Sequence, residues 1–380
     1  MDLSGLKYLV VGAGFFGSVI AERIANELNE RVLVIDLRGH LGGNSYSFPD
    51  PTTNIEVHKY GSHIFHTSNV HVWNYVNKFT TFNNYRHRVM TNVRNRIYSM
   101  PINLMTINAF FEKQMRPEEA RAFIAAEIQR EHLHDPKNLE EKAISLIGRS
   151  LYEAFIKGYT QKQWQTSLTD LPSNIITRLP VRYTYNDFYF SDKYEGIPTD
   201  GYGKIFERML DHPNIEVKLG IDYFKIKDQI PNSCMTIYTG PIDRFFDFKY
   251  GQLSWRTTEF EVERLSVTDY QGVSVMNFAD VEIPFTRIHE FRHYHPEREQ
   301  ADSQTLIFRE YSKAAKENDV PYYPVNTERD KKLFRLYQED ALKLENVIFG
   351  GRLGNYVYID MHQAIAMALN TFNSRIKKEN

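Results

Sequence analysis

The chain has 380 residues, with 46 Lys and Arg against 48 Asp and Glu, so its formal net charge is −2. This length predicts two or three domains. A near-neutral balance provides no general attraction for nucleic acid or an anionic membrane, so a bound anion must be held by individual Arg and Lys side chains. A single cysteine, Cys234, excludes an intramolecular disulfide and a cysteine metal cluster. No stretch approaches the ~18 apolar residues of a membrane span, so we expect a soluble, cytoplasmic protein without membrane insertion.

The chain opens with the pattern of a strand, a glycine-rich turn and a helix. In KYLVVGAGFFGSVIAERIANEL (7–28), an apolar run precedes Gly12, Gly14 and Gly17, and apolar residues at helical spacing follow. Gly12 permits the tight turn, Gly14 lets a pyrophosphate approach the backbone, and Gly17 lets the helix pack on the strand. A second apolar run ends at Asp36, where a carboxylate would accept ribose hydroxyls. This order predicts a dinucleotide-binding domain, with the phosphates at the helix N-terminus.

The first motif leaves NAD and FAD open, and the segment RGHLGGN (38–44) favours FAD. It places Gly42 and Gly43 just after the second strand. Such a second glycine turn resembles that of two-dinucleotide-binding flavoproteins, in which the chain wraps the far side of FAD. A tight loop without a ligand is the alternative interpretation.

The remaining patterns predict a mixed α/β (α+β) fold. Residues 103–171 have helical patterns, with a helix starting at Pro117. Residues 177–194 and 254–311 alternate polar with β-branched or aromatic residues, which predicts an antiparallel sheet. Strands within 214–224, 233–243 and 346–370 return to the first domain, and the last is followed by a helix near Asp360. We expect a Rossmann-like FAD-binding domain (1–79, 201–243 and 319–380), an inserted helical domain (101–172) and an antiparallel β-sheet substrate domain (80–100, 173–200 and 244–318).

The segment HEFRH (289–293) matches the zinc-protease pattern H-E-x-x-H. That chemistry needs a helix, so that two histidines one turn apart meet one ion. The surrounding residues alternate as in a strand, where residues four apart lie ~13 Å from one another. We therefore expect a strand and no metal site.

Several segments outside the nucleotide-binding pattern carry polar and aromatic residues that suit a second ligand. Arg side chains would meet phosphate oxygens, Trp would stack on a flat base, and Tyr hydroxyls would contact a diphosphate. Each is an ordinary structural residue when taken alone, and together they predict a cleft for a nucleoside diphosphate. The residues are His63, His66, Thr160, Trp164, Arg178, Arg182, Arg287, Tyr323, Tyr358 and Asp360.

Over nearly its whole length the chain resembles the bacterial UDP-galactopyranose mutase family. The motifs are GAGFFG, GGN, YGSHIFHT, EEKAISLIG, IKGYTQKQW, RLPVRYT, YFSDKYEGIP, YTGPID, YYPVN and GGRLGNY, whereas NNYRHR (83–88) aligns less clearly. The resemblance implies an isomerase that interconverts UDP-galactopyranose and UDP-galactofuranose for cell-wall or surface polysaccharide synthesis. It further implies that reduced FAD is the active form, that its N5 attacks the anomeric carbon with UDP as leaving group, and that the protein is a homodimer.

The same resemblance assigns the site residues. Catalytic roles fall to Arg178, Arg287 and His66. Substrate binding falls to Phe155, Thr160, Trp164, Arg178, Tyr189, Asn277, Arg287, Tyr323 and Tyr358. Cofactor binding falls to Gly12, Gly14, Phe16, Gly17, Asp36, Leu37, Gly43, Asn44, His63, Ile64, Arg352, Asp360 and Met361.

Two other functions fit the opening motif. One is a flavin oxidoreductase of the amine-oxidase type, which would oxidise its substrate stoichiometrically. The other is a non-enzymatic binding protein similar to the Rab GDP-dissociation inhibitors, which would be colourless. The second glycine turn and the Arg and Tyr residues argue against both, and whether N-acetylated or other UDP-hexoses are accepted stays open.

Overall fold

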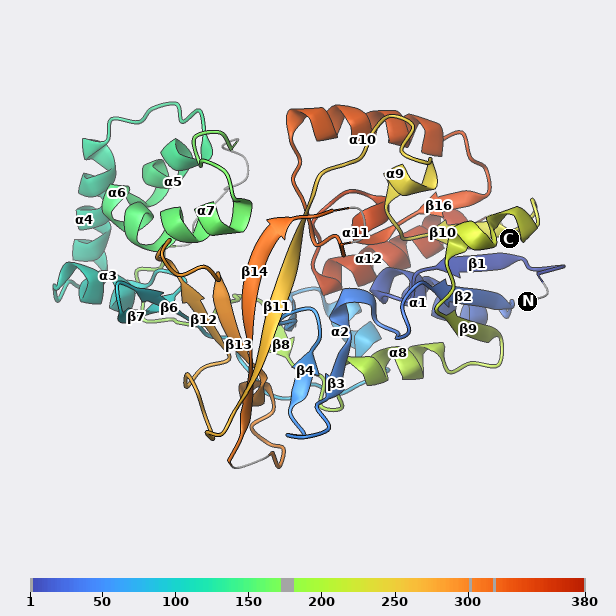
Figure 1. The fold of residues 1–380 in the computed structure, drawn as a ribbon, viewed down its shortest axis with the longest axis horizontal. Helices are drawn as coiled ribbons and strands as arrows, with labels where there is room; N and C mark the ends of the chain where they lie inside the picture. The colour runs from blue at the N-terminus through green and yellow to red at the C-terminus, as the bar shows by residue number, and fades with distance from the viewer. Residues whose placement is uncertain (1–2, 172–180, 301–302, 317–318, 379–380) are drawn as a thin grey trace.

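The structure is a computed structural model that describes residues 3–171, 181–300, 303–316 and 319–378 (Figure 1). Two large sheets organise it, a parallel sheet of five strands and a mostly antiparallel sheet of seven. A group of helices from the middle of the chain forms a separate lobe, at the left in Figure 1. The predicted mixed α/β fold is confirmed. In the part of the chain that is described, no helix is both long and apolar enough to cross a membrane.

The parallel sheet has the strand order β16-β10-β1-β2-β9. Its central strands are the two apolar runs at the start of the chain, and burial on both faces suits such runs. The strands expected within 214–224, 233–243 and 346–370 are confirmed. Because all five are parallel, their carboxyl ends share one edge, where ligands bind in such sheets. The strands are β1 (Tyr8–Val11), β2 (Val32–Asp36), β9 (Ile215–Leu219), β10 (Met235–Tyr238) and β16 (Val347–Phe349).

Helices α1 (Phe15–Arg23), α8 (Tyr202–Leu210) and α12 (Met361–Thr371) pack in one apolar core with this sheet. The first of them begins directly after Gly14, as the glycine motif predicts. Asp360 is the N-cap of α12, so the predicted helix start there is confirmed. Two short helices, α9 (Ile242–Phe245) and α11 (Gly351–Gly354), and the longer α10 (Glu328–Ala341) follow strands later in the chain.

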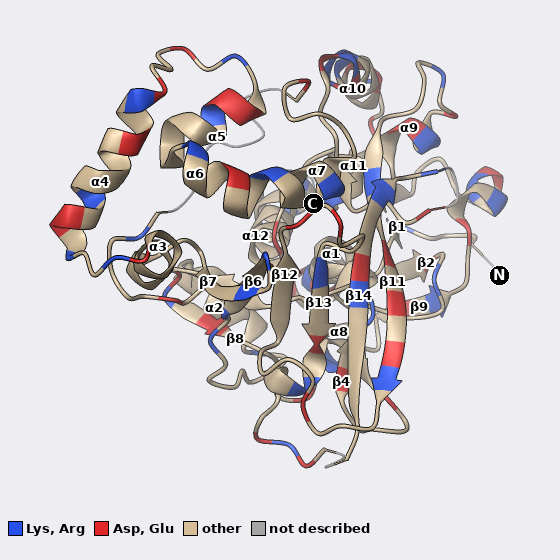
Figure 2. Ribbon diagram, turned by 60° about the vertical axis from the view of Figure 1, so that its left-hand side comes forward, with Lys and Arg blue, Asp and Glu red and all other residues tan. Residues whose placement is uncertain are grey.

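The larger sheet has the order β15-β11-β14-β13-β12-β6-β7, and only β6 and β12 pair in parallel. Charged residues alternate along β11 and β14 (Figure 2), where Arg309 lies 2.6 Å from Glu263 and Lys313 lies 3.1 Å from Glu259. One face of this pair is therefore solvated, and on the other Leu306 and Phe308 pack in an apolar cluster. The strands are β6 (Val89–Val93), β7 (Arg96–Met100), β11 (Trp255–Leu265), β12 (Val275–Phe278), β13 (Arg287–Glu290), β14 (Thr305–Ala314) and β15 (Tyr323–Pro324).

The helical lobe confirms the pattern expected for residues 103–171, and α4 begins at Pro117 as predicted. Its helices enclose an apolar core of their own. They are α3 (Leu104–Phe111), α4 (Pro117–Arg130), α5 (Leu139–Ile147), α6 (Arg149–Leu151), a π-helical stretch (Tyr152–Lys157) and α7 (Gly158–Trp164).

Short elements complete the fold. Two small antiparallel pairs join β3 (Ser47–Pro49) to β4 (Glu56–His58), and β5 (Phe65–Thr67) to β8 (Tyr194–Gly196). One more helix, α2 (Val70–Val76), follows β5, and the remaining stretches are single helical turns: Ile24–Leu28, Gly43–Ser45, Tyr223–Lys225, Lys227–Gln229, Phe291–Tyr294 and Phe372–Ile376.

The strand expected across 177–194 is wrong for its described part. Residues 181–193 form no strand, and only β8 begins at the end of this segment. The Arg182 guanidinium donates to the carbonyls of Phe188 and Tyr189. The described backbone of this segment bonds only at single points to Ile102, Leu104 and His87, so no strand pairing forms. Residues 177–180 lie outside the described part of the chain.

The strand expected through HEFRH is only half right. Strand β13 ends at Glu290, and a helical turn follows over Phe291–Tyr294. Phe291 and Tyr294 of that turn are both fully buried. Residues three apart point to the same side in a helical turn but to opposite faces in a strand, so burying both requires the turn. His289 Nε2 lies 2.9 Å from Glu310 Oε2, whereas His293 Nε2 lies 3.3 Å from Asp269 Oδ1, so the two imidazoles have different partners.

Gly17 provides a test of the packing between α1 and β1. A Cβ at this position would lie 2.0 Å from the Gly12 carbonyl oxygen, so Gly17→Ala must push the helix off the strand. We expect the thermal midpoint of the apoprotein to fall by about 5 °C, the effect of an overpacked core contact. Gly39→Ala is the control, because no atom lies within 4 Å of its added Cβ. Equal midpoints for the two variants in scanning calorimetry would contradict this packing.

Candidate active site

A cavity of about 700 Å³ runs along the carboxyl edge of the parallel sheet. Of the thirteen residues expected to bind the cofactor, only Ile64 is not among those that line it, because this side chain is buried in a separate apolar cluster. The residues that do line the cavity are Gly12, Gly14, Phe16, Gly17, Asp36, Leu37, Gly43, Asn44, His63, Arg352, Asp360 and Met361.

The two glycine turns lie against each other at one end of the cavity, where the Gly42 N–H donates to the Ala13 carbonyl at 2.8 Å. A Cβ on Gly43 would lie 3.3 Å from Gly14 Cα, and Gly12 has a φ of 108° that favours glycine. Asp36 is held at the floor of this end, because its carboxylate accepts the N–H groups of Ala13 and Arg38, both at 2.8 Å. Among the described residues no side chain caps α1, so its first N–H groups can meet an anion.

Arg38 is a lining residue that the sequence analysis missed. Its guanidinium lies 4.6 Å over the Tyr60 ring, and Nη2 donates to Asn44 Oδ1 at 2.8 Å. Its Nη1 is buried and has no hydrogen-bond partner among the described residues. A buried donor without a partner is costly, so this atom is suited to an anionic or polar ligand. The sequence did contain a signal for Arg38: it is a basic residue just past the carboxyl end of β2, and ligands bind at that end of parallel strands.

His63 presents a neutral nitrogen to the cavity. Its Nδ1 lies 2.7 Å from the Gly61 carbonyl oxygen, which can only accept, so the proton is on Nδ1 and Nε2 is an acceptor. Burial lowers the pKa of His63 to about 4, helped by Arg352 and His289 and opposed by the Gly61 hydrogen bond. The imidazole is therefore uncharged at neutral pH.

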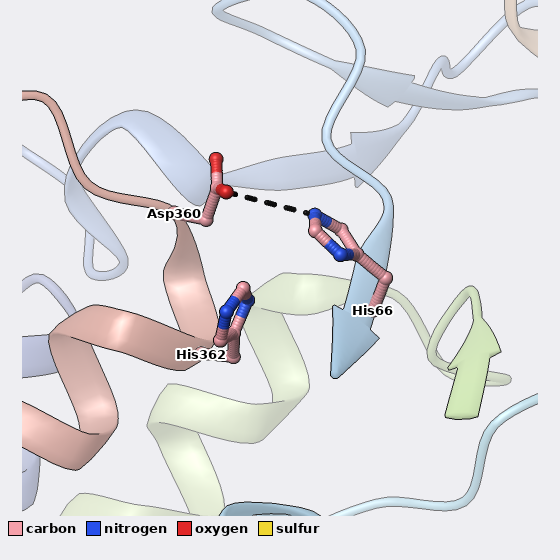
Figure 3. Close-up of side chains that lie close together, drawn as sticks. All are labelled: His66, Asp360 and His362. Carbon is pink, nitrogen blue, oxygen red and sulfur yellow. Dashed lines mark ion pairs between the residues drawn. The ribbon is translucent and has the colours of Figure 1, made fainter. Parts of the chain in front are cut away.

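His66 lies between two carboxylates. Its Nδ1 is 2.7 Å from Asp192 Oδ2, and its Nε2 is 3.8 Å from Asp360 Oδ2 across the start of α12, with His362 edge-on (Figure 3). Hydrogen bonds from Ser68 and His66 outweigh burial and lower the pKa of Asp192, so this carboxylate is ionised and accepts from Nδ1. The imidazole is thereby held in one orientation beside the cavity. Asp192 lies within YFSDKYEGIP but was not singled out in the sequence.

Two of the predicted substrate residues, Asn277 and Arg287, are neighbours at the centre of the larger sheet. Arg287 on β13 is directly opposite Asn277 on β12 and Glu310 on β14. Its Nε lies 3.4 Å from Glu310 Oε1, and its Nη2 contacts the Tyr159 hydroxyl. Burial opposes the charge of Arg287, but Glu310 and Tyr159 raise its pKa well above the usual value. Burial likewise opposes the charge of Glu310, but Arg287 and His289 lower its pKa to about 2.

Three predicted tyrosines surround this arginine. Arg287 interacts electrostatically with Tyr189 and Tyr323, and Tyr358 interacts with both Arg287 and Tyr189. The rings of Tyr323 and Tyr358 are 5.4 Å apart, and Arg352 lies 4.9 Å over Tyr358. Tyr189 and Tyr358 are 43% and 52% exposed, so this cluster is open to a ligand from solvent.

The helical lobe contributes α7 to the same region. Thr160 and Trp164 lie one turn apart on α7, as predicted, and Tyr159 beside them reaches Arg287. Tyr159 was missed, although it adjoins a residue that the sequence analysis selected. Phe155 is 3% exposed and packs on Tyr98 inside the lobe, so it is not brought into the open cluster. Arg178 lies outside the described residues.

Comparisons with known proteins agree with this architecture. A sequence profile of the UDP-galactopyranose mutase family matches residues 154–358, and one of NAD(P)-binding Rossmann-like domains matches residues 10–79. The chain is 44% identical over 369 residues to a "Probable UDP-galactopyranose mutase" of Klebsiella pneumoniae, covering 97% of this chain and 94% of that protein. It is 40% identical over 375 residues to a dTDP-fucopyranose mutase of Escherichia coli, covering 98% of each.

The fold itself has a solved counterpart. The crystal structure of a reduced UDP-galactopyranose mutase matches with a TM-score of 0.75 at 15% identity, over 98% of this chain and 96% of that one. Together with the identities to curated relatives across nearly the whole chain, these matches confirm the resemblance seen in the motifs. The chain belongs to the UDP-galactopyranose mutase family.

Proposed function

We propose that the protein is a flavin-dependent isomerase that interconverts UDP-galactopyranose and UDP-galactofuranose. The observation that carries this proposal is the cluster of Arg287 with three tyrosines, a site suited to a diphosphate and separate from the pyrophosphate turns of the cofactor cavity. Two such anion sites in one molecule suit an enzyme that binds a dinucleotide and a nucleotide sugar together. The names of the relatives support UDP-galactose as the sugar nucleotide.

The cavity fits FAD. An added Cβ at Gly14 would meet only Gly43 Cα, at 3.9 Å, so the backbone of this turn is open to a pyrophosphate. The α1 N-terminus is free of a side-chain cap among the described residues, and the buried Arg38 Nη1 has no partner among them. Reduced FAD, when bound there, would supply N5 as the nucleophile that displaces UDP from the anomeric carbon.

The chain's own contribution is mainly electrostatic. As UDP leaves, negative charge grows on its diphosphate, and Arg287 is placed to stabilise that charge. Glu310 and Tyr159 already hold the guanidinium, so little reorganisation is needed during the reaction. Although the Tyr358 side chain is half exposed, desolvation by the residues around it and the nearby Asp360 raise its pKa to about 12, so its hydroxyl keeps its proton and can donate to phosphate oxygens.

The two histidines orient groups at the site, and His63 adds no charge. His63 offers a neutral acceptor at Nε2, where an N–H or O–H of the cofactor or sugar can donate. Asp192 holds the ring of His66, which is also stacked at 3.7 Å on Phe190. Arg352 donates to the Ile359 carbonyl at 2.9 Å, which sets the start of α12 at the cavity.

Gly14 tests the cofactor assignment. Its backbone is extended (φ −81°, ψ −178°), and an added Cβ would meet only Gly43 Cα, at 3.9 Å, so Gly14→Val should fold. The valine would fill the space of the pyrophosphate, and we expect the purified variant to lose the yellow flavin absorbance that the natural protein shows. Gly39→Val is the matched control and should remain yellow. A yellow Gly14→Val protein would show that the dinucleotide lies elsewhere.

The redox state of FAD tests the reaction. We expect UDP-galactofuranose to be converted to UDP-galactopyranose only after dithionite reduction, because oxidised N5 is not nucleophilic. Anaerobic incubation followed by chromatography of the sugar nucleotides measures this. Equal rates with oxidised enzyme would reject the mechanism, and stoichiometric oxidation of the sugar would identify a flavin oxidoreductase instead. A parallel incubation with dTDP-fucofuranose compares the substrate named for the Escherichia coli relative.

Arg287 tests the electrostatic role. We expect Arg287→Ala to lower kcat on the order of 10²-fold, the typical loss when one donor to a developing anion is removed. FAD content should not change, because Arg287 does not line the cofactor cavity. Arg309→Ala removes an arginine that pairs with Glu263 on the solvated face of the same sheet, and it should keep normal turnover. Equal kcat values for the two variants would contradict the assignment.

A further inference from the structure

Lys162 on α7 makes an unusual set of contacts with the turn between β12 and β13. Its Nζ lies 2.7 Å from the carbonyl oxygen of Phe278, 2.9 Å from that of Asp280, 3.0 Å from that of Ile283 and 2.9 Å from that of Phe285. In Figure 1 this orange turn lies against α7. Four backbone oxygens therefore surround one ammonium group, as they would surround a bound metal cation.

The contacts need a charged lysine. An ammonium has three N–H donors and no acceptor, so converging carbonyl dipoles suit its charged form. Burial lowers the pKa of Lys162 to about 8, while Asp280 and Glu282 act to raise it. The side chain is thus mainly protonated at neutral pH and links the helical lobe to the larger sheet.

The turn held by Lys162 joins two strands that each carry a predicted substrate-binding residue, Asn277 on β12 and Arg287 on β13. Asn277 and Arg287 are direct partners across β12 and β13, and Asn277 immediately precedes Phe278, whose carbonyl accepts from Lys162. Arg287 has two further anchors, Glu310 and Tyr159. Asn277 Oδ1, in contrast, is buried without a hydrogen-bond partner among the described residues. Its backbone is held between Thr91 and Arg287 on the neighbouring strands, but its amide oxygen lacks such an anchor and is available to a ligand.

We infer that Lys162 is a positioning residue, which holds the β12–β13 turn against α7 and thereby sets Asn277 for the nucleoside of the substrate. This inference rests on the proposed function, because it takes a UDP-sugar as the ligand of the cleft. Gly158 supports the close approach: a Cβ there would lie 2.1 Å from the Ala279 carbonyl oxygen, so only glycine lets α7 meet the turn.

The test uses Lys162→Met, which keeps the apolar stem and removes the ammonium. With the FAD-loaded enzyme, we expect KM for UDP-galactofuranose and Kd for UDP each to rise about tenfold, the scale of a lost hydrogen bond to a charged group. We expect kcat to change by less than about threefold, because Arg287 keeps its other anchors. FAD content should stay unchanged, since the turn does not line the cofactor cavity. Lys157→Met removes an exposed lysine just before α7 and should leave all four quantities as they are.

Gly158→Ala is the second variant, because it displaces the turn while Lys162 stays intact, and it should raise the same KM and Kd. If Lys162→Met does not fold, the KM and Kd of Gly158→Ala test whether the position of the turn controls UDP binding. The inference is overturned if UDP binds the folded variants with the natural Kd, or if FAD is lost in parallel with UDP binding, which would indicate a general folding role. A natural enzyme that neither binds UDP nor converts the sugar nucleotide would instead refute the proposed function.

Discussion

The ion pair between Arg287 and Glu310 is the interaction on which the arrangement of the site depends. A partly buried guanidinium among aromatic rings is costly unless it is paired and hydrogen-bonded. Glu310 on the neighbouring strand provides the opposite charge, and Tyr159 brings a hydroxyl from the helical lobe. The charge is therefore fixed by two parts of the fold before any anion arrives.

The pair also reaches the cofactor side through a chain of hydrogen bonds. Tyr294 donates to Ser62, the Ser62 hydroxyl lies 2.5 Å from His289 Nδ1, and His289 Nε2 lies 2.9 Å from Glu310. Ser62 immediately precedes His63 in the loop that lines the cofactor cavity. The larger sheet, the helical lobe and this loop thus share one polar network, and moving any one of them would leave a buried group without its partner.

The cofactor side of the site has a neutral His63 and the substrate side a charged Arg287, and one physical reason explains the difference. Burial disfavours the charged form of both Arg287 and His63, but Arg287 is paired with the Glu310 carboxylate, whereas among the described residues His63 Nδ1 meets only the Gly61 carbonyl. On the cofactor side, burial and the nearby Arg352 keep His63 neutral, whereas Glu310 keeps Arg287 charged. A neutral acceptor beside the cofactor and a fixed cation beside the diphosphate suit the displacement of a nucleotide from a sugar.

The sequence by itself determined the features whose causes are local. Continuous apolar runs predicted the inner parallel strands, the glycine motif predicted the start of α1, and Pro117 predicted the start of α4. The residues that line the cavity next to those elements could also be predicted, because the carboxyl ends of parallel strands share one edge of the sheet whatever the strand order.

Tertiary structure decided which side chains of the site meet, because these pairings depend on strand register and on contacts between distant segments. Nothing in the local pattern places Glu310 opposite Arg287, points Lys162 at four carbonyls of another domain, or sets Asp192 against His66. The wrong strand across 181–193 has the same origin, since its backbone bonds to scattered partners and not to one continuous neighbouring strand. These partners are the Arg182 side chain and the backbone of Ile102, Leu104 and His87. A polar or aromatic residue in the sequence shows which bonds it can make, and only packing shows which partner comes within reach.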